Sequence, residues 1–191
     1  MSKCEDISGI LKYLQKNLTY KRFHHSLGVA YTASALAMCH GVNLKDAELA
    51  GLLHDCAKWM DNEESIKFCT QNNISISEIE KRNPYLLHGK IGCFIAANKF
   101  EIDNEDVLKA ISNHTTGRPE MTSLEKIIFI ADYIEPSRET LTNLPEIRKI
   151  AFKDLNGALI RILKDTLEYL SNRGGEMDPM TIKTYDYYRA E

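Results

Sequence analysis

Apolar residues recur three and four positions apart along nearly the whole chain, which is the spacing of an amphipathic helix. The pattern is clear in residues 7–14, 124–131 and 155–170. Alternation of apolar and polar residues, which marks a strand, is confined to residues 74–77. That segment is too short and isolated to seed a sheet. The spacing therefore predicts an all-α fold.

Turn-forming residues divide this helical pattern. Clusters such as Asn72-Asn73, Asn83-Pro84 and Leu144-Pro145 separate about eight predicted helices. No cluster is long enough to be an interdomain linker, and 191 residues with 43% hydrophobic content suffice for one core of ordinary size. We expect a single domain over residues 1–191, with its core at about residues 20–172.

The C-terminal tail, residues 173–191, carries an aromatic patch made of Tyr185, Tyr187 and Tyr188. We expect this tail to dock on the body of the protein rather than to extend into solvent. The same tyrosines would suit the interface of a homodimer, but single exposed aromatic residues are ordinary. The sequence leaves the oligomeric state open.

The composition limits the partners. A balance of 24 basic against 27 acidic residues, a net charge of −3, provides no general attraction for nucleic acid or anionic membrane. The five cysteines are widely spread and never form a CxxC pair, which argues against disulfides and thiolate zinc sites. We interpret them as reduced core residues. Because no stretch approaches the roughly 18 apolar residues of a membrane span, we expect a cytoplasmic protein.

The pair His54-Asp55 directly follows the apolar run of residues 49–53. Removing an imidazole and a carboxylate from water costs several kcal/mol unless they are paired or bind a metal. No Lys or Arg precedes them in that run to serve as a partner. The pair therefore predicts a bound cation and indicates a metallohydrolase.

Other candidate ligands share this setting. His25, His88 and His114 lie on or at the ends of predicted helices, and Asp132 lies in an apolar helical segment without a basic partner at helical spacing on its N-terminal side. A single histidine of this kind is more often a hydrogen-bonded core residue, but the presence of the His54-Asp55 pair favours ligation. Mixed nitrogen and oxygen donors point to iron, manganese, zinc or nickel rather than calcium.

Two histidines are set apart from this group. His24 competes with His25, because adjacent residues on a helix cannot point in the same direction. His40 precedes Gly41 at a predicted helix end, where a histidine commonly faces the terminal carbonyls. We assign His40 no chemistry.

The order and context of these residues resemble the HD-domain metal-dependent phosphohydrolases, and in particular the YqeK subfamily of symmetrical bis(5'-nucleosyl)-tetraphosphatases. The resemblance covers the chain from roughly Tyr20 onward. Phe23 stands where that family often has tyrosine. The segments on which this resemblance rests are Arg22-Phe23-His24-His25-Ser26-Leu27, Leu53-His54-Asp55-Cys56-Ala57-Lys58, Leu87-His88-Gly89, His114-Thr115-Thr116-Gly117 and Ile130-Ala131-Asp132-Tyr133-Ile134-Glu135-Pro136-Ser137-Arg138.

The resemblance implies a compact helical bundle that holds two metal ions, commonly iron, and splits diadenosine tetraphosphate into two ADP. It favours His25 over His24 and implies that Asp55 bridges the metals, where it would take part in catalysis. The implied ligand sets are His25, His54, Asp55 and Asp132 for one metal, and Asp55, His88 and His114 for the other.

Four basic residues could hold the substrate's phosphates. Lys58 lies four residues after His54, about one helical turn, although a solvated lysine at a helix end is the competing interpretation. Arg118 lies in the loop of residues 115–119, where a glycine permits close approach and a guanidinium can bind phosphate through two hydrogen bonds. Arg22 and Arg138 are secondary candidates, because surface arginines near helix ends are usually solvated.

Three functions stay open at this point. The first is the symmetrical dinucleoside polyphosphate hydrolase, which requires two metals and releases a nucleoside diphosphate. The second is an HD-type nucleotidase or deoxynucleoside triphosphate hydrolase with one metal, in which His88 and His114 would face the substrate. The third is a nucleotide-binding sensor without turnover.

Overall fold

The computed structural model describes residues 7–138, 143–174 and 176–190. Within these ranges it contains eleven α-helices, one 3-10 helix and no strand, which confirms the all-α prediction. The elements are α1 (Ile7–Asn17), α2 (Tyr20–His40), α3 (Leu44–Leu53), α4 (Asn62–Gln71), α5 (Glu78–Arg82), η1 (Pro84–Leu87), α6 (His88–Lys99), α7 (Glu105–Asn113), α8 (Ser123–Ile134), α9 (Leu144–Ala151), α10 (Leu155–Asn172) and α11 (Pro179–Ala190).

The prediction of about eight helices was too low, because short helices form where the sequence suggests only turns. Ser77 starts the five-residue α5 with a capping box, in which its side chain and that of Glu80 satisfy each other's backbone N–H groups. Leu144 and Pro145, interpreted as a break, instead begin α9, since proline is well tolerated in the first turn of a helix.

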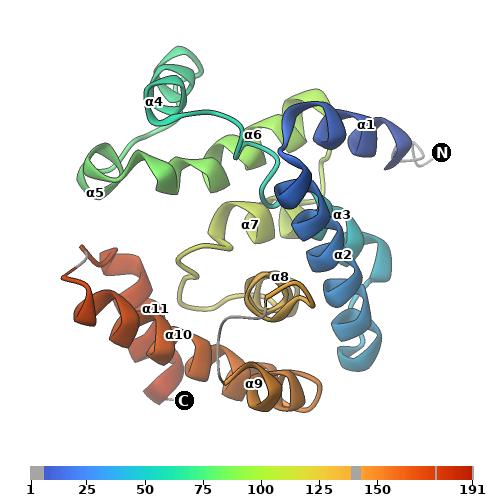
Figure 1. Ribbon diagram of the computed structural model, residues 1–191, viewed down its shortest axis with the longest axis vertical. Helices are drawn as coiled ribbons and strands as arrows, with labels where there is room; N and C mark the ends of the chain where they lie inside the picture. Colours follow the sequence, from blue (N-terminus) through green and yellow to red (C-terminus); the bar gives the residue numbers. More distant parts are fainter. Residues whose placement is uncertain (1–6, 139–142, 175, 191) are drawn as a thin grey trace.

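Helix α8 lies at the centre of the fold. Figure 1 shows it end-on, with α7 on one side and α9 on the other, and it contacts α2, α3, α7, α9 and α10. A helix that is apolar on nearly every side belongs inside a protein, and most of α8 is buried. The buried residues of α8 are Leu124, Glu125, Ile127, Ile128, Phe129, Ile130, Ala131 and Ile134.

Two helix ends meet where α6 approaches α7. A Cβ atom on Gly89 would lie only 2.7 Å from the backbone oxygen of Ser112, so only glycine permits this distance between the helices. Gly89 follows His88, the first residue of α6, and Ser112 stands two residues before His114, the C-terminal capping residue of α7. The close contact therefore brings these two histidines together.

Helix α11 contacts α10. Tyr188 on α11 is buried, and its hydroxyl accepts a hydrogen bond from the backbone N–H of Met121 (2.6 Å). The other end of α11 faces the segment around α5, and residues of both segments line one cavity.

The cysteines differ in part from the prediction of buried residues. Cys56 and Cys69 are buried and Cys93 is partly buried, but Cys39 is exposed and Cys4 lies outside the described residues. At the surface, Cys39 donates its thiol hydrogen to the backbone oxygen of Phe152 (3.0 Å). No helix in the described part of the chain is both long and apolar enough to cross a bilayer.

Candidate metal centre

The six predicted ligands come from five separate elements and converge on one point. His25 lies on α2, His88 begins α6 and Asp132 lies near the end of α8. His54 and His114 are the C-terminal capping residues that directly follow α3 and α7, respectively. Asp55 and all four histidines are buried, whereas the Asp132 side chain is 26% exposed. One side of the cluster is thus open to solvent.

Asp55 stands between two pairs of histidines. Its Oδ2 atom lies 3.8 Å from His25 Nε2 and 3.5 Å from His54 Nε2. Its Oδ1 atom lies 3.4 Å from His88 Nε2 and 3.6 Å from His114 Nε2. Each carboxylate oxygen therefore faces a different pair, which is the arrangement of a carboxylate that bridges two cations.

Asp132 belongs to the first of these pairs. Its Oδ1 atom lies 3.0 Å from His25 Nε2 and 3.9 Å from His54 Nε2. Groups of three donors that could hold a metal ion therefore overlap in this cluster: His25, His54 and Asp55; His54, His114 and Asp132; and Asp55, His88 and His114.

Backbone carbonyls fix three of the imidazole rings. In each case the Nδ1 atom lies within hydrogen-bond distance of the carbonyl three residues earlier, and because a carbonyl only accepts, Nδ1 must donate. The hydrogen then sits on Nδ1, and the lone pair of Nε2 points into the cluster. The three contacts are His54 to Gly51 (2.7 Å), His88 to Tyr85 (2.6 Å) and His114 to Ile111 (2.7 Å).

His25 is fixed by a side chain instead. Its Nδ1 atom donates to Oε1 of Glu135 (3.0 Å), a carboxylate that is 1% exposed. Glu135 also accepts hydrogen bonds from the backbone N–H and the hydroxyl of Ser137. The sequence alone does not reveal this role, because a glutamate directly before a proline, as Glu135 is before Pro136, is typical of a helix boundary.

This donor set requires cations. The Nε2 atoms of His25 and His54 are buried and make no hydrogen bond to any described residue. His88 Nε2 lies 3.0 Å from His114 Nε2, and burial together with the neighbouring His114 lowers the pKa of His88 to about 3, so His88 is neutral at pH 7. Buried lone pairs that face one another and two carboxylates are stabilised by metal ions. The residues fit first-row transition metals.

The carboxylates stay ionised despite burial. Burial alone would raise the pKa of Asp55, but His54, His114 and His88 outweigh it and hold that pKa well below its usual range. Burial would likewise raise the pKa of Asp132, and His25 and His54 outweigh it, so the pKa of Asp132 also lies below its ordinary value. Both groups can therefore act as anionic ligands.

Two arginines predicted as secondary phosphate ligands contact the two carboxylates directly. Arg22 donates to Oδ2 of Asp55 (2.6 Å), and Arg138 donates to Oδ1 of Asp132 (2.9 Å). Their side chains are 38% and 42% exposed, respectively. Positive charge is thus available at the open side of the cluster.

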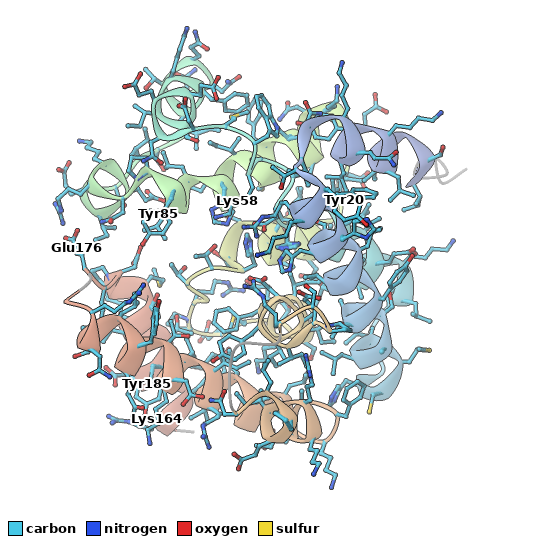
Figure 2. The ribbon with its side chains drawn as sticks, in the orientation of Figure 1. Tyr20, Lys58, Tyr85, Lys164, Glu176 and Tyr185 are labelled. Carbon is cyan, nitrogen blue, oxygen red and sulfur yellow. The ribbon has the colours of Figure 1, made fainter. Side chains whose placement is uncertain are left out.

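Lys58 does not share a helix with His54. Helix α3 ends at Leu53, and Lys58 follows in a series of turns in which its backbone N–H donates to the carbonyl of Asp55 (3.0 Å). Its side chain lies near the middle of the view in Figure 2. Burial lowers the pKa of Lys58 below its ordinary value, although the neighbouring Asp55 opposes this effect. No carboxylate of the described residues lies within ion-pair distance of the Lys58 ammonium.

Arg118 is held by a protein partner. Its guanidinium donates to both carboxylate oxygens of Glu125 (2.8 and 2.6 Å) and to the backbone oxygen of Pro119 (2.9 Å). Glu125 is buried and also accepts from Asn113 and from the backbone N–H of Thr122. The structure therefore pairs Arg118 with α8 instead of presenting it to the ligand cluster.

The remaining two histidines lie apart from the cluster. His24 is exposed and lies against Tyr20 in a tilted arrangement, with ring centroids 4.1 Å apart. His40 contacts the backbone oxygen of Ala151 (2.7 Å). Only His25 of the adjacent pair points inward, as expected from the sequence.

Thr115 is a neighbour of the cluster that the sequence did not single out. Its hydroxyl oxygen lies 3.2 Å from His88 Nε2 and 3.3 Å from His114 Nε2. Thr115 follows His114 directly, so its position depends on the turn that ends α7.

Comparisons with known proteins agree with this geometry. A family model described as "HD domain" matches residues 22–137. A Bacillus subtilis protein named "Bis(5'-nucleosyl)-tetraphosphatase, symmetrical" is 38% identical over 177 residues, which are 93% of this chain and 94% of its own length. A protein of the same name from Halalkalibacterium halodurans is 40% identical over 176 residues, or 92% of this chain and 93% of its own.

A solved structure has the same fold. The crystal structure titled "predicted HD superfamily hydrolase involved in NAD metabolism" from Clostridium acetobutylicum matches with a TM-score of 0.93 and 45% identity, and the match covers 96% of each chain. Fold, ligand cluster and sequence similarity agree. The chain therefore belongs to the HD-domain family of metal-dependent hydrolases and, within it, to the group of the symmetrical bis(5'-nucleosyl)-tetraphosphatases.

Proposed function

We propose that this protein hydrolyses dinucleoside tetraphosphates symmetrically, so that one water and diadenosine tetraphosphate give two ADP. In this reaction the P–O bond in the middle of the tetraphosphate breaks, and each half leaves with two phosphates. The names of the relatives support this substrate. The observation that carries the proposal is the position of Asp55, whose two oxygens face two different pairs of histidines.

The overlapping groups of donors in the ligand cluster suit a pair of metal ions, and iron suits their mixture of imidazole and carboxylate. One would be held by the side that contains His25, His54 and Asp132, the other by His88 and His114, with Asp55 shared. Metal ions of this kind lower the pKa of water and neutralise charge on phosphate oxygens.

The chain's own residues supply orientation and charge. Glu135 and three backbone carbonyls keep the imidazole lone pairs directed inward. Arg22 and Arg138 lie at the open side, where they can exchange their carboxylate partners for substrate phosphates. Lys58, which has no carboxylate partner in the described structure, adds a third cation beside Asp55.

The test is to incubate the purified protein with diadenosine tetraphosphate and iron or manganese and to separate the products by chromatography. ADP as the sole product, lost in Asp55→Ala and retained in Asp103→Ala, is the expected result. Asp103 is exposed and makes a matched control. AMP together with ATP would contradict symmetrical cleavage, and tight product binding without turnover would favour the sensor.

Other expectations from the sequence stay predictions. They are the single-domain organisation, a homodimer, a cytoplasmic location and the absence of a nucleic-acid partner.

A further inference from the structure

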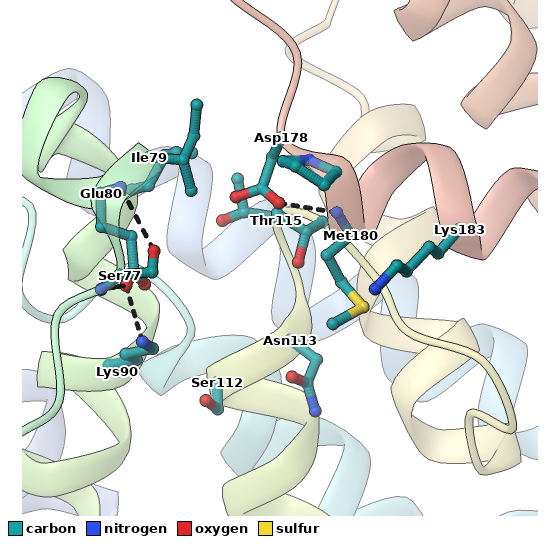
Figure 3. A pocket seen from close by; sticks show the side chains of 13 residues that line it. Ser77, Ile79, Glu80, Lys90, Ser112, Asn113, Thr115, Asp178, Met180 and Lys183 are labelled. Carbon is teal, nitrogen blue, oxygen red and sulfur yellow. Dashed lines mark hydrogen bonds and ion pairs between the residues drawn. The ribbon is translucent and has the colours of Figure 1, made fainter.

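A cavity of about 340 Å³ lies between α5, the end of α7 and the start of α11. Figure 3 shows its lining, with Ser77 and Ile79 on one wall and Met180 and Lys183 on the opposite wall. The walls come from segments about a hundred residues apart in sequence, so the cavity exists only in the folded chain.

The cavity borders the metal centre through Thr115. This residue lines the cavity, and its hydroxyl oxygen lies 3.2 Å from His88 Nε2 and 3.3 Å from His114 Nε2. A ligand in the cavity is therefore one side chain away from the half of the cluster that contains His88 and His114.

The lining combines apolar surface with a few polar groups, which is typical of small-molecule sites. Ile79, Leu86 and Met180 offer apolar faces for a flat base. Asp178 uses Oδ1 to accept the backbone N–H of Met180 (2.7 Å), and its other oxygen can accept hydrogen bonds from ribose hydroxyls. The volume lies near the lower end of the ~300–1,000 Å³ range of ligand sites, which suits one nucleoside.

Lys183 adds a positive charge to this lining. Its side chain runs from α11 towards Met180 in Figure 3, and no carboxylate in the described ranges lies within ion-pair distance of its ammonium. The other lysine of the lining, Lys90, is already paired with Glu80 (2.7 Å). Lys183 is therefore the lysine of this lining that is available to an anionic ligand.

An ion pair joins the two walls beside the cavity. Arg82 at the end of α5 donates through Nε and Nη2 to Oε1 of Glu176 (3.0 and 2.5 Å), and Asn83 donates to Oε2 of Glu176 (2.8 Å). Glu176 precedes α11 and reaches towards α5 in Figure 2. The contact links the end of α5 to the segment that precedes α11.

We infer that this cavity binds the nucleoside of one half of a dinucleoside polyphosphate, with Lys183 attracting the phosphates that lead from it to the metal centre. The inference rests on the proposed function, since it assigns a subsite for that substrate. It also accounts for recognition of the nucleoside, for which the ligand cluster itself offers no apolar surface.

Photolabelling tests the site without requiring turnover. The manganese-loaded protein is irradiated with 8-azido-ADP, digested, and the labelled peptides are identified by mass spectrometry. Label in residues 112–116 or 178–183 that excess ADP abolishes is the expected result. Label confined to other segments, or no protectable label, would overturn the inference.

Kinetics provide the second test. Lys183→Ala should raise the KM for diadenosine tetraphosphate by about ten-fold, the loss expected for a charged contact. Met180→Trp should also raise the KM, because the larger side chain fills the cavity, and neither variant should change kcat or metal content much. Lys183→Arg should recover most of the affinity. Lys149→Ala, at an exposed position of α9, serves as the control.

An unchanged KM in both cavity variants would overturn the inference even if the enzyme is active. If the unmodified protein does not hydrolyse the dinucleotide at all, the proposed function fails, and the photolabelling result still decides whether the cavity binds a nucleoside.

Discussion

Glu135 accepts a hydrogen bond from Nδ1 of His25 at 3.0 Å, although the two residues lie 110 positions apart in the sequence. The contact joins α8 to α2 and directs Nε2 of His25 towards Asp132. A carboxylate behind a ligating histidine fixes its tautomer and makes it a stronger donor. The orientation of His25 in the ligand cluster therefore depends on Glu135, which is not itself one of the predicted ligands.

Replacing Glu135 should weaken metal binding. We expect Glu135→Ala to lower the affinity for Mn²⁺ by about 10- to 100-fold, because His25 loses its orientation. Glu135→Gln retains an acceptor oxygen and should lose less. Titration against a fluorescent chelator measures the affinity, and equal values for Glu135→Ala and the unmodified protein would contradict the role given to Glu135.

Gly28 provides the space for this carboxylate. A Cβ atom at Gly28 would lie 2.5 Å from Oε2 of Glu135. Alanine normally stabilises a helix relative to glycine by about 1 kcal/mol, but crowding in a packed interior costs about 1–3 kcal/mol. We therefore expect Gly28→Ala to lower both the melting temperature and the metal affinity, whereas Lys21→Ala on the exposed face of α2 should change neither. A stabilised Gly28→Ala variant with normal metal binding would refute this.

Metal loading should stabilise the protein and report how many ions bind. At a free metal concentration of 100 times Kd, each site adds about 2.7 kcal/mol to the free energy of unfolding. We expect two metals per chain in the unmodified protein, one in His88→Ala, and no thermal shift in Asp55→Ala. Elemental analysis gives the count, and one metal in the unmodified protein would favour the mononuclear nucleotidase.

Arg118→Ala should affect stability rather than substrate binding. It removes both side-chain hydrogen bonds from Arg118 to the buried Glu125. Glu125 then retains the hydrogen bonds from Asn113 and from the backbone N–H of Thr122. The loss should be about 1–3 kcal/mol in the free energy of unfolding, measured by urea denaturation, with the KM unchanged. A raised KM at normal stability would instead restore Arg118 to the phosphate site.

Glu80 should make the fold sensitive to acid. Burial alone would raise the pKa of Glu80, but hydrogen bonds from Lys90 and Ser77 outweigh it and hold the pKa below its ordinary value of 4.5. The stabilisation is present above pH 4.5 and is lost as the pH falls towards the folded-state pKa, because the unfolded state binds the proton first. Glu80→Gln should be less stable at pH 7 and show a smaller further loss on acidification in urea melts. An equal loss in both proteins on acidification would rule this role out.

The sequence predicts which side chains come together in the cluster because each candidate ligand lies in an apolar context, where an unpaired polar group would be costly. Neither Asp55 nor Asp132 has a lysine or arginine three or four residues before it, and the four histidines occur at helix positions or ends. Each of these signals can be recognised from the residues that surround the ligand in the sequence. The all-α fold follows from the same periodicity.

The errors concern helix ends and side-chain partners that the apolar periodicity does not specify. Arg118 lies in a glycine-containing loop, as expected, but its partner Glu125 is set by the capping box of α8. Glu135 could have been noticed, since it lies three residues after Asp132 on the same helical side. Lys58 was placed on a helix because nothing in its local sequence indicates that α3 ends at Leu53.

The three rings tied to carbonyls of their own chain segment differ in origin from the ring tied to Glu135. His54, His88 and His114 each obtain their orientation within four consecutive residues, so a fragment as short as one helical turn encodes it. His25 obtains its orientation only when two remote helices dock. Random substitutions in the core that shift α8 against α2 will therefore damage the His25 side of the centre first, and the Asp55–His88–His114 side will outlast it during mutational drift.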